Sequence, residues 1–175
     1  MSAEDAVLAT AEAIADGKDV PADHRQYVSF AVGHEQYAVD IMSVREIKGW
    51  TEVTSLPNQP EYVRGVLNLR GAVLPIVDLQ RRLGGQMTET TPRHVIVIVA
   101  LGNRQVGMLV DAVSDILDVA TDKIQPVPET NARDDARVLS GFLTDDEQMV
   151  AMLDLERLLS AEVFGERMET EEAAA

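Results

Sequence analysis

The stretch Val63-Arg-Gly-Val-Leu-Asn-Leu-Arg-Gly-Ala-Val-Leu-Pro-Ile-Val-Asp78 decides the fold of this 175-residue chain. Two runs rich in β-forming residues, 66–69 and 72–77, flank the dipeptide Arg70-Gly71. A glycine at this point supplies the positive φ that a tight hairpin turn requires. The stretch therefore predicts a β-hairpin with Arg70 at its tip.

The residues after the hairpin predict one short helical turn. Asp78 can cap a turn over residues 79–83, and Gly84 can end it. The same region holds a local cluster of basic residues in an acidic protein: Arg64, Arg70, Arg81 and Arg82.

The sequence also contains an internal repeat. Residues 99–116 match residues 30–47 at a constant shift of 69, so that Glu46 falls on Asp115. Residues 152–159 match residues 76–83 at a shift of 76. Each half has about five short strands and too few residues to bury a good core alone. We therefore expect a mainly β fold of two small five-stranded barrels packed against each other.

Other elements follow from periodicity and turn residues. A continuous aliphatic run at 95–101 predicts a strand buried on both faces. Ile41, Val44 and Ile47 recur every third residue, which suits helical or 3₁₀ turns. The remaining expected elements are strands at 27–32, 36–39, 50–56 and 105–110 and a C-terminal helix from Asp154 to about Met168.

The expected domain organisation has three parts. Residues 1–25 form a flexible acidic N-terminal tail, residues 26–164 form the folded domain, and residues 165–175 form a disordered acidic tail. Within the folded domain, one barrel is expected at 26–93 and the other at 94–159, followed by the C-terminal helix.

Composition excludes several classes of function. The formal net charge of −15 disfavours nucleic-acid binding, which depends on Lys and Arg at phosphates, and favours a basic or amphipathic partner. No apolar run reaches the roughly 20 residues that span a bilayer. Glu4, Asp5 and Glu12 stand where a signal peptide would carry basic residues, so a cytoplasmic location without membrane insertion is expected. The chain has no cysteine, which excludes thiol catalysis and cysteine metal sites.

No motif in the sequence indicates catalysis, a metal or a cofactor. His24, His34 and His94 lie on a linker, a turn and a strand start, without carboxylates at ligand spacing. Asp145-Asp146-Glu147 lacks the pattern of a calcium loop and occupies the place of Arg70-Gly71 in the repeat, so we expect a solvated hairpin tip. The Gly84-Gly85 pair lacks the Lys and Ser or Thr of a phosphate loop. We therefore expect no catalytic residue and no cofactor.

Glu46 and Arg70 differ from the other charged residues. Each lies where an apolar pattern meets a turn, and in a small barrel the two could approach each other. On the residues alone, a solvated ion pair and a recognition site remain equally open, because exposed ion pairs contribute little stability.

Three ordered motifs resemble a known family over roughly residues 26–164. They are Tyr37-Ala-Val-Asp-Ile-Met-Ser-Val-Arg-Glu-Ile47, the hairpin stretch from Val63 to Leu79, and Val106-Gly-Met-Leu-Val-Asp-Ala-Val-Ser-Asp-Ile-Leu117. Together they are similar to CheW, the family of chemotaxis coupling proteins, and to the related regulatory domain of the histidine kinase CheA. The resemblance implies two intertwined five-stranded SH3-like barrels and a non-enzymatic adaptor. Such an adaptor joins the cytoplasmic tip of a chemoreceptor to CheA in membrane-associated arrays.

The resemblance also implies site residues. On the receptor side it points to Val44, Glu46 and Arg70, with Val44 as an apolar contact and the other two as a polar pair. On the kinase side it points to Val95, Glu129 and Phe164. For Val95, an interface residue and a buried core residue remain equally open. Thr130 and Gln125 depart from residues that the family can show, and self-association in rings is a further partner that the resemblance leaves open.

Three alternatives are retained. One is a coupling protein of a parallel array, for twitching motility or another signalling pathway. The second is a small enzyme or ligand-binding barrel, which would need a pocket with convergent polar groups. The third is a nucleic-acid-binding barrel, for which only Tyr27, Tyr37 and Trp50 could stack on bases and the surrounding charge is wrong.

Overall fold

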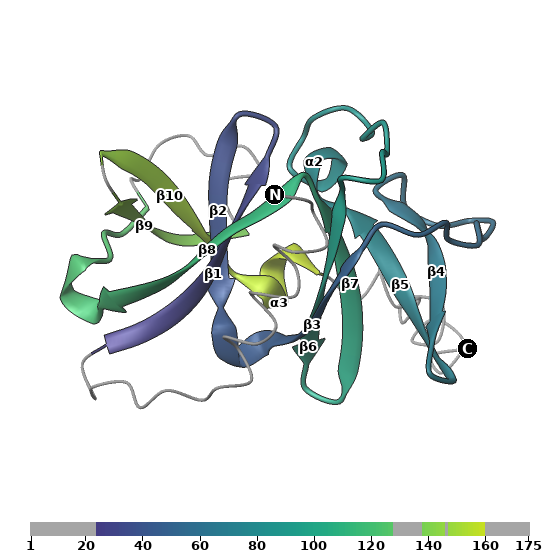
Figure 1. Cartoon of the computed structure of the whole chain (residues 1–175), viewed down its shortest axis with the longest axis horizontal. Helices are drawn as coiled ribbons and strands as arrows, with labels where there is room; N and C mark the ends of the chain where they lie inside the picture. Colours follow the sequence, from purple (N-terminus) through teal and green to yellow (C-terminus); the bar gives the residue numbers. More distant parts are fainter. Residues whose placement is uncertain (1–23, 128–137, 146, 160–175) are drawn as a thin grey trace, which may run out of the picture.

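The computed structural model describes residues 24–127, 138–145 and 147–159 of the chain. Its strands form two five-stranded sheets that curl into barrels lying side by side (Figure 1). In chain order the elements are β1 His24–Val32, β2 Glu35–Asp40, the 3₁₀ helix η1 Ile41–Ser43, β3 Val44–Gly49, β4 Val63–Leu69, β5 Ala72–Asp78, α2 Leu79–Arg82, β6 Val95–Leu101, β7 Arg104–Val110, β8 Ala112–Ala120, the 3₁₀ helix η2 Thr121–Lys123, β9 Leu139–Asp145, β10 Gln148–Leu153 and α3 Leu155–Leu158. The expected mainly β fold with two five-stranded sheets is confirmed.

The two barrels exchange strands between the halves of the chain. The first barrel has the strand order β8-β1-β2-β10-β9, and the second has β3-β6-β7-β5-β4. Each barrel therefore takes two strands from one half and three from the other. The expected division into barrels at 26–93 and 94–159 is wrong, because β3 leaves the first half to pair with β6, and β8 returns to pair with β1.

The internal repeat appears in the structure at the shifts read from the sequence. A shift of 76 carries β4 onto β9 and α2 onto α3, and a shift of 69 carries β2 onto β7. Even the irregularities recur. Arg45 in β3 and its repeat equivalent Ser114 in β8 are both unpaired residues at β-bulges. The same holds for Arg64 in β4 and its equivalent Ser140 in β9. The two halves therefore share backbone detail as well as sequence.

The bulge at Arg45 explains an incorrect expectation. Val44 faces Val99 and Glu46 faces Ile98, so Arg45 is unpaired. One extra residue shifts the alternation of the strand, which places Val44 and Ile47 together in the main core. The spacing of three that suggested helical turns arises here from a bulged strand, and only residues 41–43 are 3₁₀.

Two further expectations need correction or lie outside the described part. The strand expected at 50–56 is absent, and this segment makes one isolated bridge, from Thr54 to Val66. Of the expected C-terminal helix, the structure describes the four residues of α3, and residues from 160 onward lie outside the described ranges, as do both tails.

The main core lies between the barrels. It includes Val28 and Phe30 of β1 and Val97 of β6, together with α2 and α3 residues such as Leu79 and Leu158. Each barrel has its own smaller interior, and alternate residues of β6 face the main core and the interior of the second barrel. The predicted burial of β6 on both faces is confirmed. No helix in the described residues has the length and apolar character needed to cross a bilayer.

Two glycines close the barrels. The segment after β3 crosses β4 at the bridge Thr54–Val66, and the segment after β8 crosses β9 at the bridge Gln125–Phe142. A Cβ atom on Gly65 would lie 2.2 Å from the carbonyl oxygen of Thr54, and one on Gly141 would lie 2.8 Å from that of Gln125. Because both obstacles are backbone atoms, the crossing requires glycine.

Alanine at these positions is expected to loosen the closure. We expect Gly65→Ala to lower the free energy of unfolding by about 3 kcal/mol, since it adds positive-φ strain to a backbone clash, and Gly141→Ala by about 2 kcal/mol. Gly49→Ala is the control, because nothing lies within 4 Å of its added Cβ. Urea unfolding measures all three, and equal stability of Gly65→Ala and Gly49→Ala would contradict the closure argument.

Candidate functional site

The hairpin between β4 and β5 ends in a tight turn with an unusual residue. Arg70 has φ of 53° and Gly71 has φ of 86°, the pattern of a type I′ turn. The Asn68 side chain accepts a hydrogen bond of 3.1 Å from the Gly71 N–H. The predicted hairpin is confirmed, but the left-handed backbone falls on the arginine as well as on the glycine.

Arg70 reaches from this turn to the opposite end strand of the barrel. Its Nη2 lies 2.9 Å from Oε1 of Glu46 on β3, although β3 and β4 are the two end strands of the sheet. The Arg70 side chain is 75% exposed and that of Glu46 is 28% exposed. The expectation that these residues approach each other is confirmed.

The turn and the ion pair together indicate a role outside the fold. An arginine with positive φ is less favourable than Gly, Asn or Asp, the residues typical of this turn. An exposed ion pair of this kind adds at most about 1 kcal/mol to the free energy of unfolding. Stability alone therefore gives little reason for arginine at this position, and an uncommon backbone conformation held at a loop tip is a reason to suspect function.

Val44 lies elsewhere than expected. Its side chain is 4% exposed and belongs to the main core, so it offers no apolar contact on the surface of the described chain. The apolar residue exposed on this hairpin is Val73, at 65%, two positions after Gly71. The exposure of Val73 could have been predicted from the sequence. Side chains alternate between the two faces of a strand, so if Leu74 and Ile76 of β5 face the interior, Val73 faces outward.

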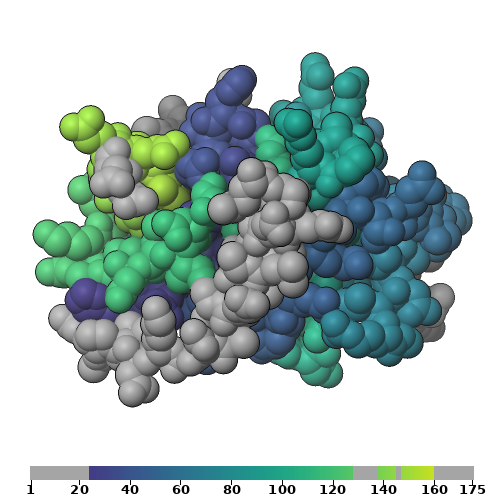
Figure 2. Space-filling model, viewed as in Figure 1, coloured from purple at the N-terminus to yellow at the C-terminus, as the bar shows by residue number. Residues whose placement is uncertain are grey.

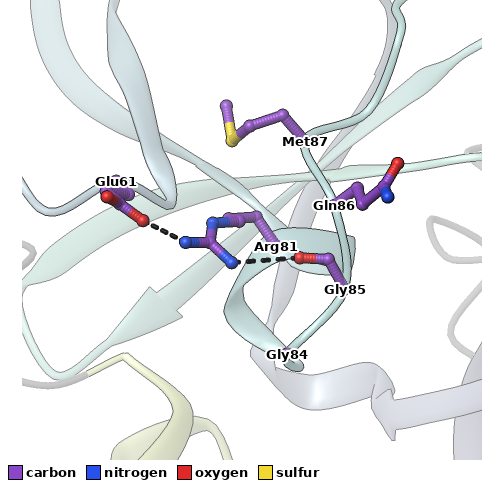
Figure 3. A pocket seen from close by; sticks show the side chains of 6 residues that line it. All are labelled: Glu61, Arg81, Gly84, Gly85, Gln86 and Met87. Atoms are coloured by element: carbon purple, nitrogen blue, oxygen red, sulfur yellow. Dashed lines mark hydrogen bonds and ion pairs between the residues drawn. The ribbon is translucent and has the colours of Figure 1, made fainter.

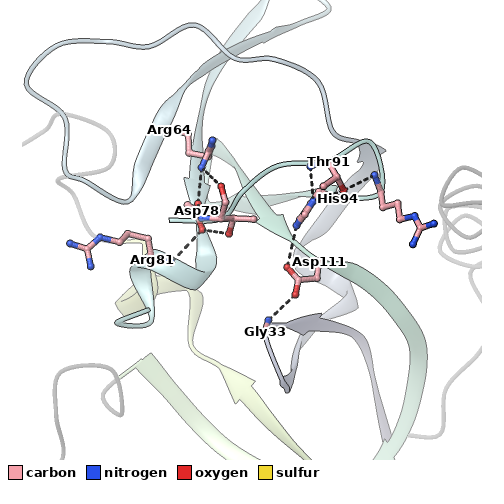
Figure 4. A network of polar contacts seen from close by, with 9 residues as sticks. Gly33, Arg64, Asp78, Arg81, Thr91, His94 and Asp111 are labelled. Carbon is pink, nitrogen blue, oxygen red and sulfur yellow. Dashed lines mark hydrogen bonds and ion pairs between the residues drawn. The ribbon is translucent and has the colours of Figure 1, made fainter. Parts of the chain in front are cut away.

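The base of the hairpin is held by a buried carboxylate. The fully buried Asp78 accepts hydrogen bonds from Thr88 N and Oγ1, both 2.8 Å, from Arg64 Nη1 at 2.9 Å and from Arg81 N at 3.3 Å (Figure 4). Arg64 also donates to the Thr88 carbonyl and lies 5.5 Å above the Trp50 ring. This network joins β4, β5 and the loop at Thr88, and the helix cap predicted for Asp78 is confirmed.

The expected cluster of basic side chains is not a free surface. Arg81 pairs with Glu61 and donates to the Gly85 carbonyl in an open pocket beside Met87 (Figure 3). Arg82 donates from Nε to the Leu158 carbonyl at 2.8 Å and stacks on Tyr62, which ties α2 to the end of α3. Arg64, Arg81 and Arg82 therefore hold the fold, and Arg70 stands apart from them.

The three residues expected on the kinase side are not brought together. Val95 is 2% exposed and belongs to the main core, which supports the buried alternative for its side chain. Glu129 and Phe164 lie outside the described residues.

Two of the three histidines, His94 and His24, take part in contacts within the fold. Nδ1 of His94 accepts a hydrogen bond from the Thr91 N–H at 3.0 Å, and its Nε2 lies 3.4 Å from Oδ1 of Asp111. Asp111 in turn accepts from the Gly33 N–H at 2.8 Å, which joins the barrels (Figure 4). Nδ1 of His24 lies 2.9 Å from Oδ1 of Asp118. Across the described ranges, no three His, Cys, Asp or Glu side chains are placed to hold a metal ion.

Comparisons with known proteins agree with this architecture. The family model described as the CheW-like domain matches residues 26–163. A probable chemotaxis protein CheW of Rhizobium etli is 47% identical over 136 residues, covering 78% of this chain and 88% of that protein. The chemotaxis protein CheW of Rhizobium meliloti is 46% identical over 138 residues, covering 79% and 89%. The crystal structure of the scaffolding protein TtCheW from Thermoanaerobacter tengcongensis is similar with a TM-score of 0.72 at 29% identity, covering 78% and 92%.

Replacing the tip arginine with a residue suited to the turn is expected to stabilise the fold. Arg70→Asn relieves the unfavourable backbone conformation and loses only an exposed ion pair, so we expect the free energy of unfolding to rise by about 0.5 kcal/mol. Urea unfolding measures the change. A loss above about 1 kcal/mol would mean that the arginine side chain supports the fold.

The buried carboxylate is expected to behave in the opposite way. Asp78→Ala leaves Arg64 and Thr88 without their partner and should lower the free energy of unfolding by about 3 kcal/mol. Asp154→Ala is the matched control, because Asp154 is the repeat equivalent and caps α3 while partly exposed. Its loss should cost about 1 kcal/mol. Similar losses in the two variants would contradict the role given to the Asp78 network.

Proposed function

This chain belongs to the CheW-like domain family, and we propose that it is a scaffolding protein of a chemotaxis system that couples a chemoreceptor to the histidine kinase CheA. In this proposal the chain contributes no catalysis and holds no cofactor. It works at the cytoplasmic tip of the receptor, within a membrane-associated array.

The exposed pair Glu46–Arg70 is the observation that supports a receptor contact most strongly. The arginine lies in a tight turn with a φ of 53°, which is unfavourable for this residue type, and its side chain is 75% exposed. Burial under a partner would remove water from the pair and make its geometry and charge matter much more than in the free protein. Val73, exposed on the same hairpin, is the apolar residue available beside it.

Val44 fits this proposal as a supporting residue. It is packed in the main core two positions before Glu46, so its volume fixes where the bulged strand places the carboxylate. On the kinase side, Glu129 and Phe164 remain proposed contacts of the CheA regulatory domain. Val95 would act from the core, by supporting the start of β6.

Charge reversal at the tip is expected to weaken receptor binding without unfolding the protein. We expect Arg70→Glu to reduce affinity for a receptor signalling fragment by about tenfold, or roughly 1.4 kcal/mol, because it places two carboxylates at the contact. Arg25→Glu is the matched control, since Arg25 is 64% exposed and also pairs with an aspartate, on the other barrel. Calorimetric titration measures both affinities.

The functional readout is autophosphorylation of the cognate CheA reconstituted with the receptor fragment and this protein. Activity should rise only when all three are present, and Arg70→Glu should reduce that rise while Arg25→Glu leaves it intact. If the wild-type protein binds neither partner, the coupling function is overturned. If it binds both and Arg70→Glu matches the control, only the site assignment fails.

A further inference from the structure

The first barrel contains a counterpart of the Glu46–Arg70 site that lacks its cation. We propose that this counterpart, the groove between β8 and β9, binds an extended basic segment of a partner protein. The proposal does not depend on the receptor assignment, because it uses the other barrel and a different pair of strands. Figure 2 shows the green residues of β8 and η2 at the surface of the left-hand barrel.

The groove lies between the two end strands of the first sheet. β8 and β9 are the end strands of their sheet, and in the described residues no ladder joins them. The cavity between them measures about 400 Å³. The buried side chains of Leu117 and Leu143 form its floor, and the exposed residues Asp115, Asp118 and Thr144 stand on its rim.

The internal repeat shows what the groove is missing. In the second barrel the equivalent opening, between β3 and β4, is crossed by the 2.9 Å contact of Arg70 with Glu46. The shift of 69 carries Glu46 onto Asp115, which keeps the carboxylate. In the sequence, the shift of 76 carries Arg70 onto Asp146, so the repeat has an acid at the position of the base. The carboxylate of Asp115 has no ion pair within the described part of the chain.

The charge around the groove favours a basic segment over a neutral one. The strand β8 and the turn after it carry Asp115, Asp118 and Asp122, with Lys123 as the one base lining the groove. Among the described residues, His24 contacts Asp118, which leaves Asp115 as the rim carboxylate without an ion pair. A concave surface lined mainly by acids raises the local concentration of cationic ligands.

The strand edge supplies the second part of the recognition. β8 pairs with β1 on one side. Its other edge faces the groove, and within the described ranges no strand pairs with the backbone groups along that edge. An extended segment of about five residues can add to such an edge through main-chain hydrogen bonds. One Arg or Lys in that segment would then meet Asp115, as Arg70 meets Glu46 in the other barrel.

A peptide copied from this chain provides the probe. A synthetic peptide of residues 66–73, which carries the Arg70 sequence, is titrated into the ¹⁵N-labelled full chain while amide resonances are followed. We expect shifts at residues 115–120 and 143–144, and none with the R70E peptide. Asp115→Asn should weaken peptide binding by about fivefold. Glu156→Gln is the control, since this exposed residue loses the same charge on α3 and does not line the groove.

Several results would overturn the proposal. Shifts centred away from β8 and β9, or no shifts at about 1 mM peptide, would remove the groove as a binding site. Equal weakening by Asp115→Asn and Glu156→Gln would show general attraction to an acidic protein. Shifts at the same amides on concentrating the protein alone would identify a second copy as the occupant, in place of a separate partner.

Discussion

The packing of two barrels across one shared core is the constraint on which the rest of the structure depends. Neither half of the chain keeps all its strands in one sheet, because β3, β4 and β5 join β6 and β7, while β8, β9 and β10 join β1 and β2. The largest apolar cluster lies between the sheets, while each barrel interior is small. Since burial of apolar surface is the main source of stability, neither barrel is expected to persist without the other. Arg82 on α2, bound to the end of α3, and His94, linked through Asp111 to Gly33, add polar contacts across the same junction.

This arrangement separates the residues that hold the fold from those available to partners. Arg64 and Arg81 donate hydrogen bonds to Asp78 at the base of the β4–β5 hairpin. Because Asp78 is buried, breaking these bonds would cost stability. Six residues after Arg64, just beyond the end of β4, Arg70 lies in a tight turn with its side chain 75% exposed. An exposed charge that an ion pair already orients is suited to recognition, because part of its conformational freedom is lost before binding.

Much of the fold could be predicted from the sequence, and the failures have physical causes. The glycine of the turn, the β-rich runs and the aspartate cap indicated the hairpin and its helix, and the repeat predicted two similar halves. The repeat could not reveal the strand exchange, because similarity between two segments does not say which sheet each one joins. Val44 was expected at the surface because the family resemblance implied an apolar receptor contact there, whereas the bulge at Arg45, invisible in the sequence, places it with Ile47 in the main core. Of the candidate site, the approach of Glu46 to Arg70 was predicted, whereas Val73 was missed although the alternation of β5 exposes it.

The central claim is that the Glu46–Arg70 pair serves recognition and contributes little to the fold. A double-mutant cycle with Glu46→Gln and Arg70→Gln, measured once by urea unfolding and once by binding to a receptor signalling fragment, tests it most directly. We predict a coupling energy below about 0.5 kcal/mol for unfolding and above about 1.4 kcal/mol for binding, the second being a tenfold change in affinity. Strong coupling in unfolding together with none in binding would show that the pair is structural and would contradict the account.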